Sequence, residues 1–261
     1  GRFGVFSTNF IIPGIHAMAG GRSEVFDTES DLTVADFDNN LMINQEHTSR
    51  ADRFETFPCF SADGSEVFYC VADTVRIPDE LGNLLYSLVK VSFDANTGKL
   101  GEKVDTLWNA KDHGTSICHP KASPDGRWIM FTVSDYGTFP INHSESALHM
   151  IDLQTGEIYP MESIKGNHSD TYHSWSSDGR WFVFASKRGD GQFSKAYYCH
   201  LDEDGNPSKP FVLPQKSSRF YINNLKSFNV PDIGRTATGM RADREIKEMY
   251  NAPAETFRNL E

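Results

Sequence analysis

The stretch from residue 116 to residue 133, SICHPKASPDGRWIMFTV, holds one strand-like segment, the tetrapeptide Ser-Pro-Asp-Gly and a second strand-like segment. The same order recurs in ETFPCFSADGSEVFYCV at 55–71 and in TYHSWSSDGRWFVFAS at 171–186. The shared glycines fall at 64, 126 and 179, and a partial copy, GRFGVFSTN, opens the chain. Recurrence at this spacing indicates a repeat architecture, in which each unit must pack against its neighbours.

Each copy continues into a second pair of short strands. In ALHMIDLQTGE at 147–157, an apolar strand runs into an aspartate and a turn that ends in glycine. Such turns need positive φ and a side chain that bonds the turn backbone, which explains the Asp and Gly. Four antiparallel strands per repeat predict the blades of a β-propeller. We therefore expect an all-β chain whose propeller domain covers 1–228, with blades at 1–45, 55–110, 116–162 and 171–215.

The second strand of each unit is apolar on both faces. In RWIMFTV, residues 127–133, both alternating sets of side chains are largely apolar, whereas a strand with one wet face would alternate cleanly. A blade lies between two neighbours, so both faces of its inner strands must be buried. We expect Phe and Trp residues, among them Trp181, Phe182 and Phe184, to fill the wedges between blades.

The tetrapeptide itself has two interpretations. Ser176, His173 and Asp178 lie close in sequence and suggest a catalytic triad. A nucleophile would not recur at the same place in every blade, however. We therefore interpret Ser-x-Asp-Gly as a hairpin turn, in which Asp178 and its equivalents Asp63 and Asp125 accept hydrogen bonds from backbone amides.

Composition excludes several classes of protein. The 261 residues carry a formal net charge of −11, which argues against a nucleic-acid-binding face and gives no sign of a polybasic membrane binder. No apolar run approaches the length of a transmembrane helix, and no signal peptide is present. The chain begins at Gly1 rather than Met, so we expect a processed or truncated start. The four cysteines show no CxxC spacing and are expected to be buried thiols.

With the repeat in view, the sequence resembles the TolB-like β-propeller family, of WD-type, Ser-Pro-Asp-Gly repeats. HPKASPDGRWIMFTVSD and HSWSSDGRWFVFASKRGDG match the family repeat closely, and FPCFSADGSEVFYCVAD departs from it at Ala62 and Ser65. The resemblance covers residues 1 to about 214. Within the family, the sequence is similar to extracytoplasmic members from Bacteroides-type bacteria. It implies architecture rather than function, because the same repeat occurs in Tol-system components, oligopeptidase propellers and oligogalacturonate lyases.

Propellers of this family usually have six blades, and this chain holds about four. Two explanations stay open. The chain is part of a six-bladed or larger propeller, or it is a small closed ring in which NNLKSFNVPDI, residues 223–233, supplies the missing first strand of the first unit. The remainder, 229–261, is expected to be a charged tail with a short helix near 241–250.

Binding residues are expected on one face of the ring. Connections between blades share this face with the loops between second and third strands, which we place at 10–29, 74–84, 134–146 and 187–195. Most histidines fall in these loops or near the central channel, where imidazole could bind a metal or transfer protons. The candidate ligand-binding residues are His113, His119, His143, His173, Asp135, Lys187 and Arg188.

Two functional hypotheses follow. The first is a non-enzymatic binding scaffold that presents its loops to a protein partner or a cell-envelope polymer, with no catalytic residues, resident metal or cofactor. The second is a metal-dependent polysaccharide (uronate) lyase or hydrolase that uses the histidine-rich mouth. The sequence shows no Gly-x-Ser-x-Gly, P-loop, HExxH or GxGxxG motif. The family resemblance alone implies a periplasmic or other extracytoplasmic location.

Overall fold

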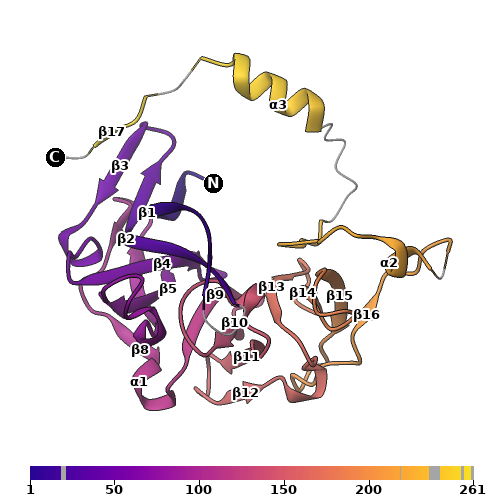
Figure 1. Ribbon diagram of the computed structural model, residues 1–261. Helices are drawn as coiled ribbons and strands as arrows, with labels where there is room; N and C mark the ends of the chain where they lie inside the picture. Colours follow the sequence, from indigo (N-terminus) through magenta and orange to yellow (C-terminus); the bar gives the residue numbers. More distant parts are fainter. Residues whose placement is uncertain (19–21, 218, 235–241, 254–255, 260–261) are drawn as a thin grey trace.

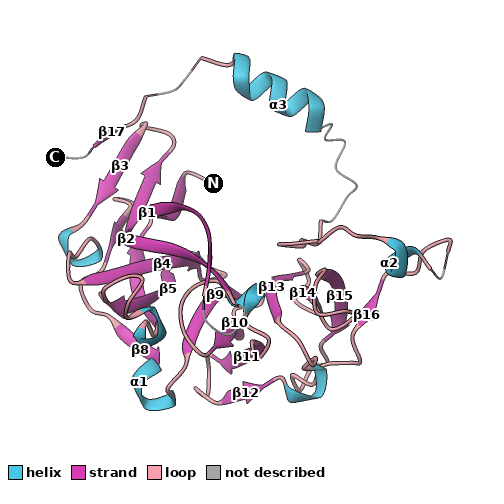
Figure 2. Cartoon of the chain, in the orientation of Figure 1, coloured by secondary structure: helices cyan, strands magenta, loops and turns pink. Residues whose placement is uncertain are grey.

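Four antiparallel sheets follow one another around a ring, which confirms the prediction of an all-β propeller (Figure 1). The computed structural model describes residues 1–261 except 19–21, 218, 235–241, 254–255 and 260–261. Strands and loops make up nearly all of this part, and the helices are few and short (Figure 2).

The sheets are numbered here as blades 1 to 4 in chain order. Blade 1 contains β1 (Phe3–Ala17), β2 (Ser23–Asp36) and β3 (Leu41–Asn44), and β17 (Arg258–Asn259) pairs in parallel with β3. Blade 2 contains β4 (Arg53–Phe60), β5 (Glu66–Asp73), β6 (Ser87–Asp94), β7 (Lys99–Leu100) and β8 (Asp105–Trp108). Blade 3 contains β9 (Ser116–Ala122), β10 (Trp128–Ser134), β11 (Ala147–Asp152) and β12 (Ile158–Pro160). Blade 4 contains β13 (Asp170–Trp175), β14 (Trp181–Ser186), β15 (Lys195–His200) and β16 (Phe211–Val212).

The α-helices are α1 (Ala110–His113), α2 (Phe220–Asn223) and α3 (Ala242–Asn251). Short 3-10 helices lie in the connections, at η2 (Glu46–Thr48), η3 (Leu81–Asn83), η4 (Pro140–Asn142) and η5 (Glu162–Ile164). The helix predicted near 241–250 is α3, which lies across the open side of the ring between blade 4 and blade 1 (Figure 1).

The repeated tetrapeptide is a hairpin turn, as predicted. In blade 3 the Ser123 hydroxyl oxygen accepts a hydrogen bond from the amide of Trp128 at 2.9 Å, and the Asp125 carboxylate accepts one from the amide of Arg127 at 3.1 Å. Gly126 has φ of 74°, which a glycine adopts without strain. Blades 2 and 4 repeat both bonds, so this serine and aspartate fix backbone rather than perform catalysis.

The core consists of apolar layers between successive blades. Every residue of β10 is buried, which confirms that inner strands are covered on both faces. Phe182 and Phe184 pack between blades 3 and 4, as expected, and each such side chain contributes about 1.5 to 3 kcal/mol when fully buried. Trp181 differs from the prediction, because its side chain is 38% exposed on the outer face of blade 4.

The predicted loop at 10–29 is instead a long hairpin. β1 and β2 remain paired as far as His16 with Glu24 and Ala17 with Ser23. The sequence suggests a loop because of Pro13 and Gly14, but the pairing register shifts between Ile12 and His16, so both residues lie at a β-bulge. The hairpin reaches from blade 1 over blade 2 towards blade 3 (Figure 1).

The prediction of a small ring closed by residues 223–233 is also wrong. Among the described strands β1 pairs with β2 alone, so residues 223–233 do not supply its missing neighbour. They lie beside blade 4, where the amide of Phe228 donates to the carbonyl oxygen of Ser194 at 2.9 Å. Extensive contacts join blade 1 to 2, 2 to 3, and 3 to 4.

The four cysteines behave as the sequence predicts. Cys70, Cys118 and Cys199 are buried, Cys59 is partly buried, and all four are free thiols. Burial raises the pKa of Cys59 to about 11, so it stays protonated at neutral pH.

Candidate functional site

A stacked pair of rings on the loop face separates two cavities. β8 ends at Trp108, and the single turn of α1 follows, where the Asn109 side chain accepts a hydrogen bond from the amide of Lys111 at 3.2 Å. Gly114 ends the turn with φ of 66°. This short helix places His113 over Trp108, with ring centroids 3.7 Å apart and planes 23° apart.

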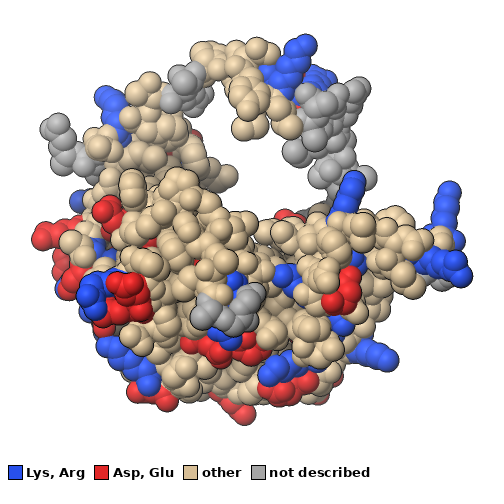
Figure 3. Space-filling view, in the orientation of Figure 1, with Lys and Arg blue, Asp and Glu red and all other residues tan. Residues whose placement is uncertain are grey.

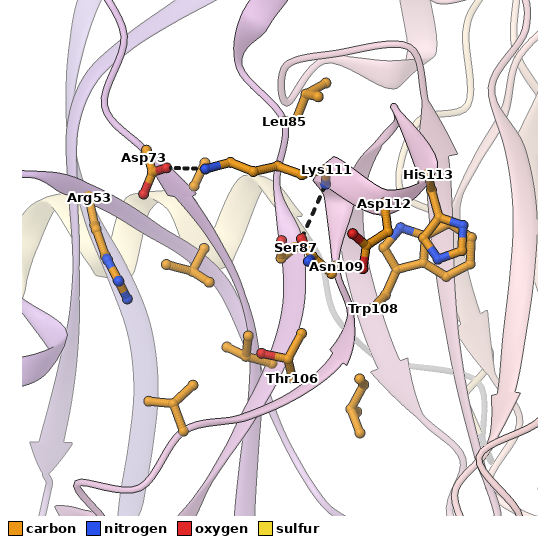
Figure 4. Close-up of a pocket in the computed structure, with 15 residues that line it drawn as sticks. Arg53, Asp73, Leu85, Ser87, Thr106, Trp108, Asn109, Lys111, Asp112 and His113 are labelled. Carbon is orange, nitrogen blue, oxygen red and sulfur yellow. Dashed lines mark hydrogen bonds and ion pairs between the residues drawn. The ribbon is translucent and has the colours of Figure 1, made fainter.

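The first cavity lies over blade 2 and has a volume of about 810 Å³. The Lys111 ammonium forms an ion pair with Asp73 at 2.7 Å across its upper edge (Figure 4). The Arg53 side chain lies near Asp73, on the side away from Trp108 and His113, and Thr106 contributes a hydroxyl group (Figure 4). No ion pair of Arg53 with an acidic side chain is found among the described residues. The cavity is therefore polar, with charges of both signs.

The second cavity lies on the other side of the same ring pair, between blades 2 and 3, and measures about 360 Å³. Its lining includes Trp108, His113, Thr115, Asp135, Glu145, His149 and Lys165. Four lining atoms are buried without a hydrogen-bond partner among the described residues. One of them, Glu145 Oε2, lies 3.2 Å from the Arg22 guanidinium and is therefore ion-paired. The other three, Trp108 Nε1, Thr115 Oγ1 and His149 Nδ1, have neither kind of partner there. An unpaired buried polar group costs about 1 to 3 kcal/mol, so a ligand that supplies partners here gains that energy.

The side chains of Trp108, Thr115 and His149 are all uncharged at neutral pH. Burial lowers the pKa of His149, so its imidazole is neutral at pH 7. Trp108 and Thr115 carry no charge at any ordinary pH. The three atoms can therefore exchange hydrogen bonds with hydroxyl groups, and a charged ligand is not required to satisfy them.

A row of strained residues lines the central channel. The innermost strands β4, β9 and β13 each contain a bulge, and each bulge holds a non-glycine residue with positive φ: Phe57 at 52°, His119 at 55° and Tyr172 at 49°. Their rings follow one another, with centroids 4.4 Å apart from Phe57 to His119 and 4.7 Å apart from His119 to Tyr172. The bulge thus places one such ring in each of blades 2, 3 and 4.

His119 and His173 lie at this channel but are not acid–base groups at neutral pH. Burial lowers the pKa of each imidazole to about 3. Nε2 of His173 lies 2.9 Å from the carbonyl oxygen of Met130, so this nitrogen carries the proton and donates it. His119 borders a cavity of about 300 Å³ that Val5, Phe6, Ser7, Phe57, Pro58, Pro120 and Lys121 complete.

His143 is part of a buried ionic network rather than a free ligand. Its Nε2 lies 2.6 Å from Glu24 on β2, and its Nδ1 lies 2.9 Å from Glu145. Burial alone would lower the pKa of His143, but the bonds to Glu145 and Glu24 outweigh it and raise the pKa to about 8. Asp135 is held in the same network by Arg22 at 2.9 Å. These residues attach the long hairpin of blade 1 to blade 3.

Lys187 and Arg188 also have structural partners. The Lys187 ammonium donates to Asn142 at 2.8 Å. Arg188 forms an ion pair with the buried Asp170 at 2.8 Å and stacks over the Tyr197 ring at 4.7 Å. Lys187 therefore ties blade 4 to the η4 loop of blade 3, and Arg188 fixes blade 4 internally.

The seven predicted residues thus fall into separate places. His113 and Asp135 line the second cavity, His119 and His173 lie at the channel, and His143 lies in the ionic network. Within the part of the chain that the structure describes, no group of three or more His, Cys, Asp or Glu side chains could hold a metal ion. The candidate histidines lie on one face or at the channel, but they do not surround a common site.

Sequence reasoning missed Trp108, Thr115 and His149. The only available signal was position, because Trp108 and Thr115 flank the connection between blades 2 and 3, which belongs to the loop face. His149 lies in the third strand of its blade, where alternation gives no hint of function. Its exposure to a cavity depends on the neighbouring blade.

Comparison with known proteins gives fold-level similarity alone. No family model and no curated protein matches the chain. A TolB from Agrobacterium tumefaciens is 18% identical with a TM-score of 0.47, and the match covers 74% of this chain and 61% of that one. A puromycin-hydrolyzing peptidase from Mycobacterium tuberculosis is 13% identical with a TM-score of 0.48, over 80% of this chain and 30% of that one.

An oligogalacturonate lyase in complex with manganese is also 13% identical, with a TM-score of 0.47, over 73% of this chain and 50% of that one. The chain thus spans between 30% and 61% of the length of these proteins. Such likeness concerns the propeller fold and says nothing about activity. Among the described residues, no helix is long and apolar enough to cross a membrane.

Proposed function

We propose that this chain is a non-enzymatic binding module, whose ligand occupies the second cavity beside the Trp108–His113 pair. The observation that carries this proposal is the set of three buried atoms without partners, on Trp108, Thr115 and His149, around one cavity. A ligand that bonds these three atoms would remove an energetic cost that the free protein bears.

The engagement of the candidate acid–base groups favours binding over catalysis. Both ring nitrogens of His143 face carboxylates, and Arg188 has its own carboxylate partner. The imidazoles of His119 and His173 stay neutral well below pH 7. A general acid or base needs a pKa near the working pH and a free reach to substrate, and these groups lack one or the other.

The chemistry of the cavity favours a hydroxyl-rich, uncharged ligand. Its unpaired atoms are an indole N–H, a hydroxyl and a neutral imidazole, whereas Asp135 and Glu145 are already bound to Arg22. A sugar hydroxyl donates and accepts hydrogen bonds at once, so it can pair with all three kinds of group. In the view of Figure 3, acidic and basic side chains lie in patches around the outer edge, and the surface between these patches is largely uncharged. We therefore assign the ligand to the neutral glycans of a cell-envelope polymer.

Titration with two soluble oligosaccharides tests the proposal. Cellohexaose serves as the neutral probe and hexagalacturonate as the acidic one, and amide chemical shifts report where each binds. We expect cellohexaose to shift residues around Thr115 and His149. Thr115→Val, which removes the hydroxyl at constant size, should weaken its binding about fivefold to tenfold.

Thr106→Val is the matched control, because Thr106 lines the first cavity and not the second. It should leave cellohexaose binding unchanged. Equal weakening by both variants, or no binding of cellohexaose, would contradict the assigned site. Cleavage of hexagalacturonate to unsaturated products would replace the binding module by the lyase alternative.

The setting of this function is part of the proposal. The resemblance to TolB-like propellers supports an extracytoplasmic, periplasmic location, where an envelope glycan is accessible. Cell fractionation of a producing strain checks this, and recovery of the chain in the cytosol alone would contradict it.

A further inference from the structure

A hydrogen bond repeats between each of blades 2, 3 and 4 and the chain segment that follows it on the inner side. The amide near the start of the innermost strand donates to the carbonyl oxygen of the residue that precedes the third strand of the previous blade. This bond occurs at Ile117 to Tyr86 (3.0 Å), Asp170 to Ser146 (3.1 Å) and Phe228 to Ser194 (2.9 Å). Residues 228–232 therefore lie against blade 4 as an innermost strand lies against the blade before it.

The backbone of this segment repeats the bulge of the innermost strands. Positive φ occurs two residues after each of these donors, at His119, at Tyr172 and, with φ of 49°, at Val230. Pro231 follows Val230, as Pro120 follows His119. Non-glycine residues rarely adopt positive φ, and a β-branched residue such as Val230 does so least readily. The recurrence of positive φ at this place therefore indicates the same strand geometry in all three segments.

This strand lacks the neighbour that the other innermost strands have. Ile117 is fully buried by pairing and packing, whereas Phe228 is 39% exposed and no described strand pairs with its segment. The outer face of blade 4 is uncovered at Trp181 as well. The equivalent Trp128 of blade 3 lies beneath Gly205 of blade 4, where a Cβ would come within 2.8 Å of the indole.

We propose that residues 228–232 form the innermost strand of a fifth blade, and that their free edge and Trp181 dock a further unit of this repeat. The occupant is an extended polypeptide strand with the Gly-Arg-aromatic pattern of second strands, paired antiparallel to residues 228–232. A turn of the same unit covers Trp181. This surface continues the interfaces that already join blades 1 to 4.

The turn of blade 1 is not the cover for Trp181, in the same chain or in a second copy. Two turns cover an aromatic residue of the preceding blade, and both use glycine: Gly98 over Phe3 and Gly205 over Trp128. Neither glycine has room for a Cβ atom. Blade 1 has Asn40 at the positive-φ position of its turn, and the carbonyl oxygen of Asn40 already accepts a hydrogen bond from Arg258 of the tail.

A synthetic peptide tests the free edge. The probe is GRFGVFSTN, the sequence of residues 1–9, which has the second-strand pattern and enough polar residues to dissolve. Hydrogen exchange of the full chain is measured with and without peptide. We expect saturable binding that slows exchange of backbone amides in 226–233, and a peptide with Val5→Pro should lose it because proline cannot donate to the ladder.

Two variants at one position separate strand pairing from mere contact. Val230→Gly keeps positive φ accessible and should bind the peptide as the parent chain does. Val230→Pro fixes φ near −65°, destroys the bulge and should weaken binding about tenfold or more. Failure of the peptide to slow exchange in 226–233, slowed exchange at β1 instead, or equal binding by both variants would overturn the fifth blade.

Discussion

Trp128 and Trp181 occupy the same position in consecutive blades, directly after the Ser-x-Asp-Gly turn and its arginine, yet one is buried and the other is not. Trp128 is 3% exposed because Gly205 of the next blade lies over its indole. Trp181 has no such cover among the described residues. The repeat places an aromatic side chain at the blade surface, but burial needs the turn of a following unit.

Blade 1 shows the covered arrangement a second time. The Phe3 ring lies under Gly98 of blade 2, where an added Cβ would come within 2.6 Å of it. Cover by a glycine turn is therefore a property of the interface and not of one tryptophan. Substitution of the aromatic residues, and of the glycines that lie over them, can show how much this cover stabilises the fold.

The largest effect is expected at the covered tryptophan. Trp128→Ala should lower the free energy of unfolding by about 4 kcal/mol, because it removes a buried indole and leaves a cavity between blades 3 and 4. Trp181→Ala should cost less than about 1 kcal/mol, since this side chain is already exposed in part. Urea denaturation with matched slopes measures both values. Equal losses would show that Trp181 is buried in solution.

A buried ionic contact between Glu24 and His143 attaches the blade 1 hairpin to blade 3. His143→Ala should cost about 3 kcal/mol, because Glu24 would stay buried without its partner. The pKa of His143 is raised from 6.5 to about 8 in the folded chain, so its stabilising effect is complete below pH 6.5. That effect is lost as pH rises through about 8, and amounts to roughly 2 kcal/mol.

Denaturation at pH 6 and at pH 9 checks this sign. The parent chain should be less stable at pH 9, and His143→Ala should lose that difference. His113→Ala is the control, because His113 stacks on Trp108 away from the carboxylate pair and should retain the parent's pH dependence. A difference that survives in His143→Ala would place the responsible group elsewhere.

Most of the fold could be predicted because its determinants are local. The Ser-x-Asp-Gly turn fixes each first hairpin through its own side chains, and apolar runs such as that of β10 show which strands are buried. The long β1–β2 hairpin could not be predicted. Pro13 and Gly14 indicate a loop locally, and only the contact of Glu24 with His143, distant in sequence, shows why the strands continue.

The site was less predictable because it depends on what is left unpaired. Histidine count and loop position led to His143, Lys187 and Arg188, whose partners lie in other blades or loops. Trp108 and His149 become candidates only when neighbouring blades form a cavity around them. Sequence reveals which groups are polar, but three-dimensional packing decides which of them lack a partner.

The glycine turns offer a finer test of cover. Gly205→Ala should cost about 2 kcal/mol, because its φ of 85° is strained for alanine and the new methyl group meets the Trp128 indole. Gly156→Ala has φ of 75° but open space around it, and should cost about 1 kcal/mol from backbone strain alone. In a chain that already carries Trp128→Ala, Gly205→Ala should cost only about 1 kcal/mol, because the indole that its methyl group would meet is absent. Gly156→Ala should cost about 1 kcal/mol with or without Trp128→Ala.

The smallest effect is expected at the turn that both tryptophans follow. Ser123→Ala removes the hydroxyl that accepts from the Trp128 amide and should cost about 1 kcal/mol. Ser176→Ala removes the equivalent bond to the Trp181 amide and should cost as much, because this bond lies within one blade and needs no neighbour. Ser177→Ala, in the exposed middle of the turn, is the control with little change. A larger loss at Ser123 than at Ser176 would mean that cover of the tryptophan also stabilises the turn before it.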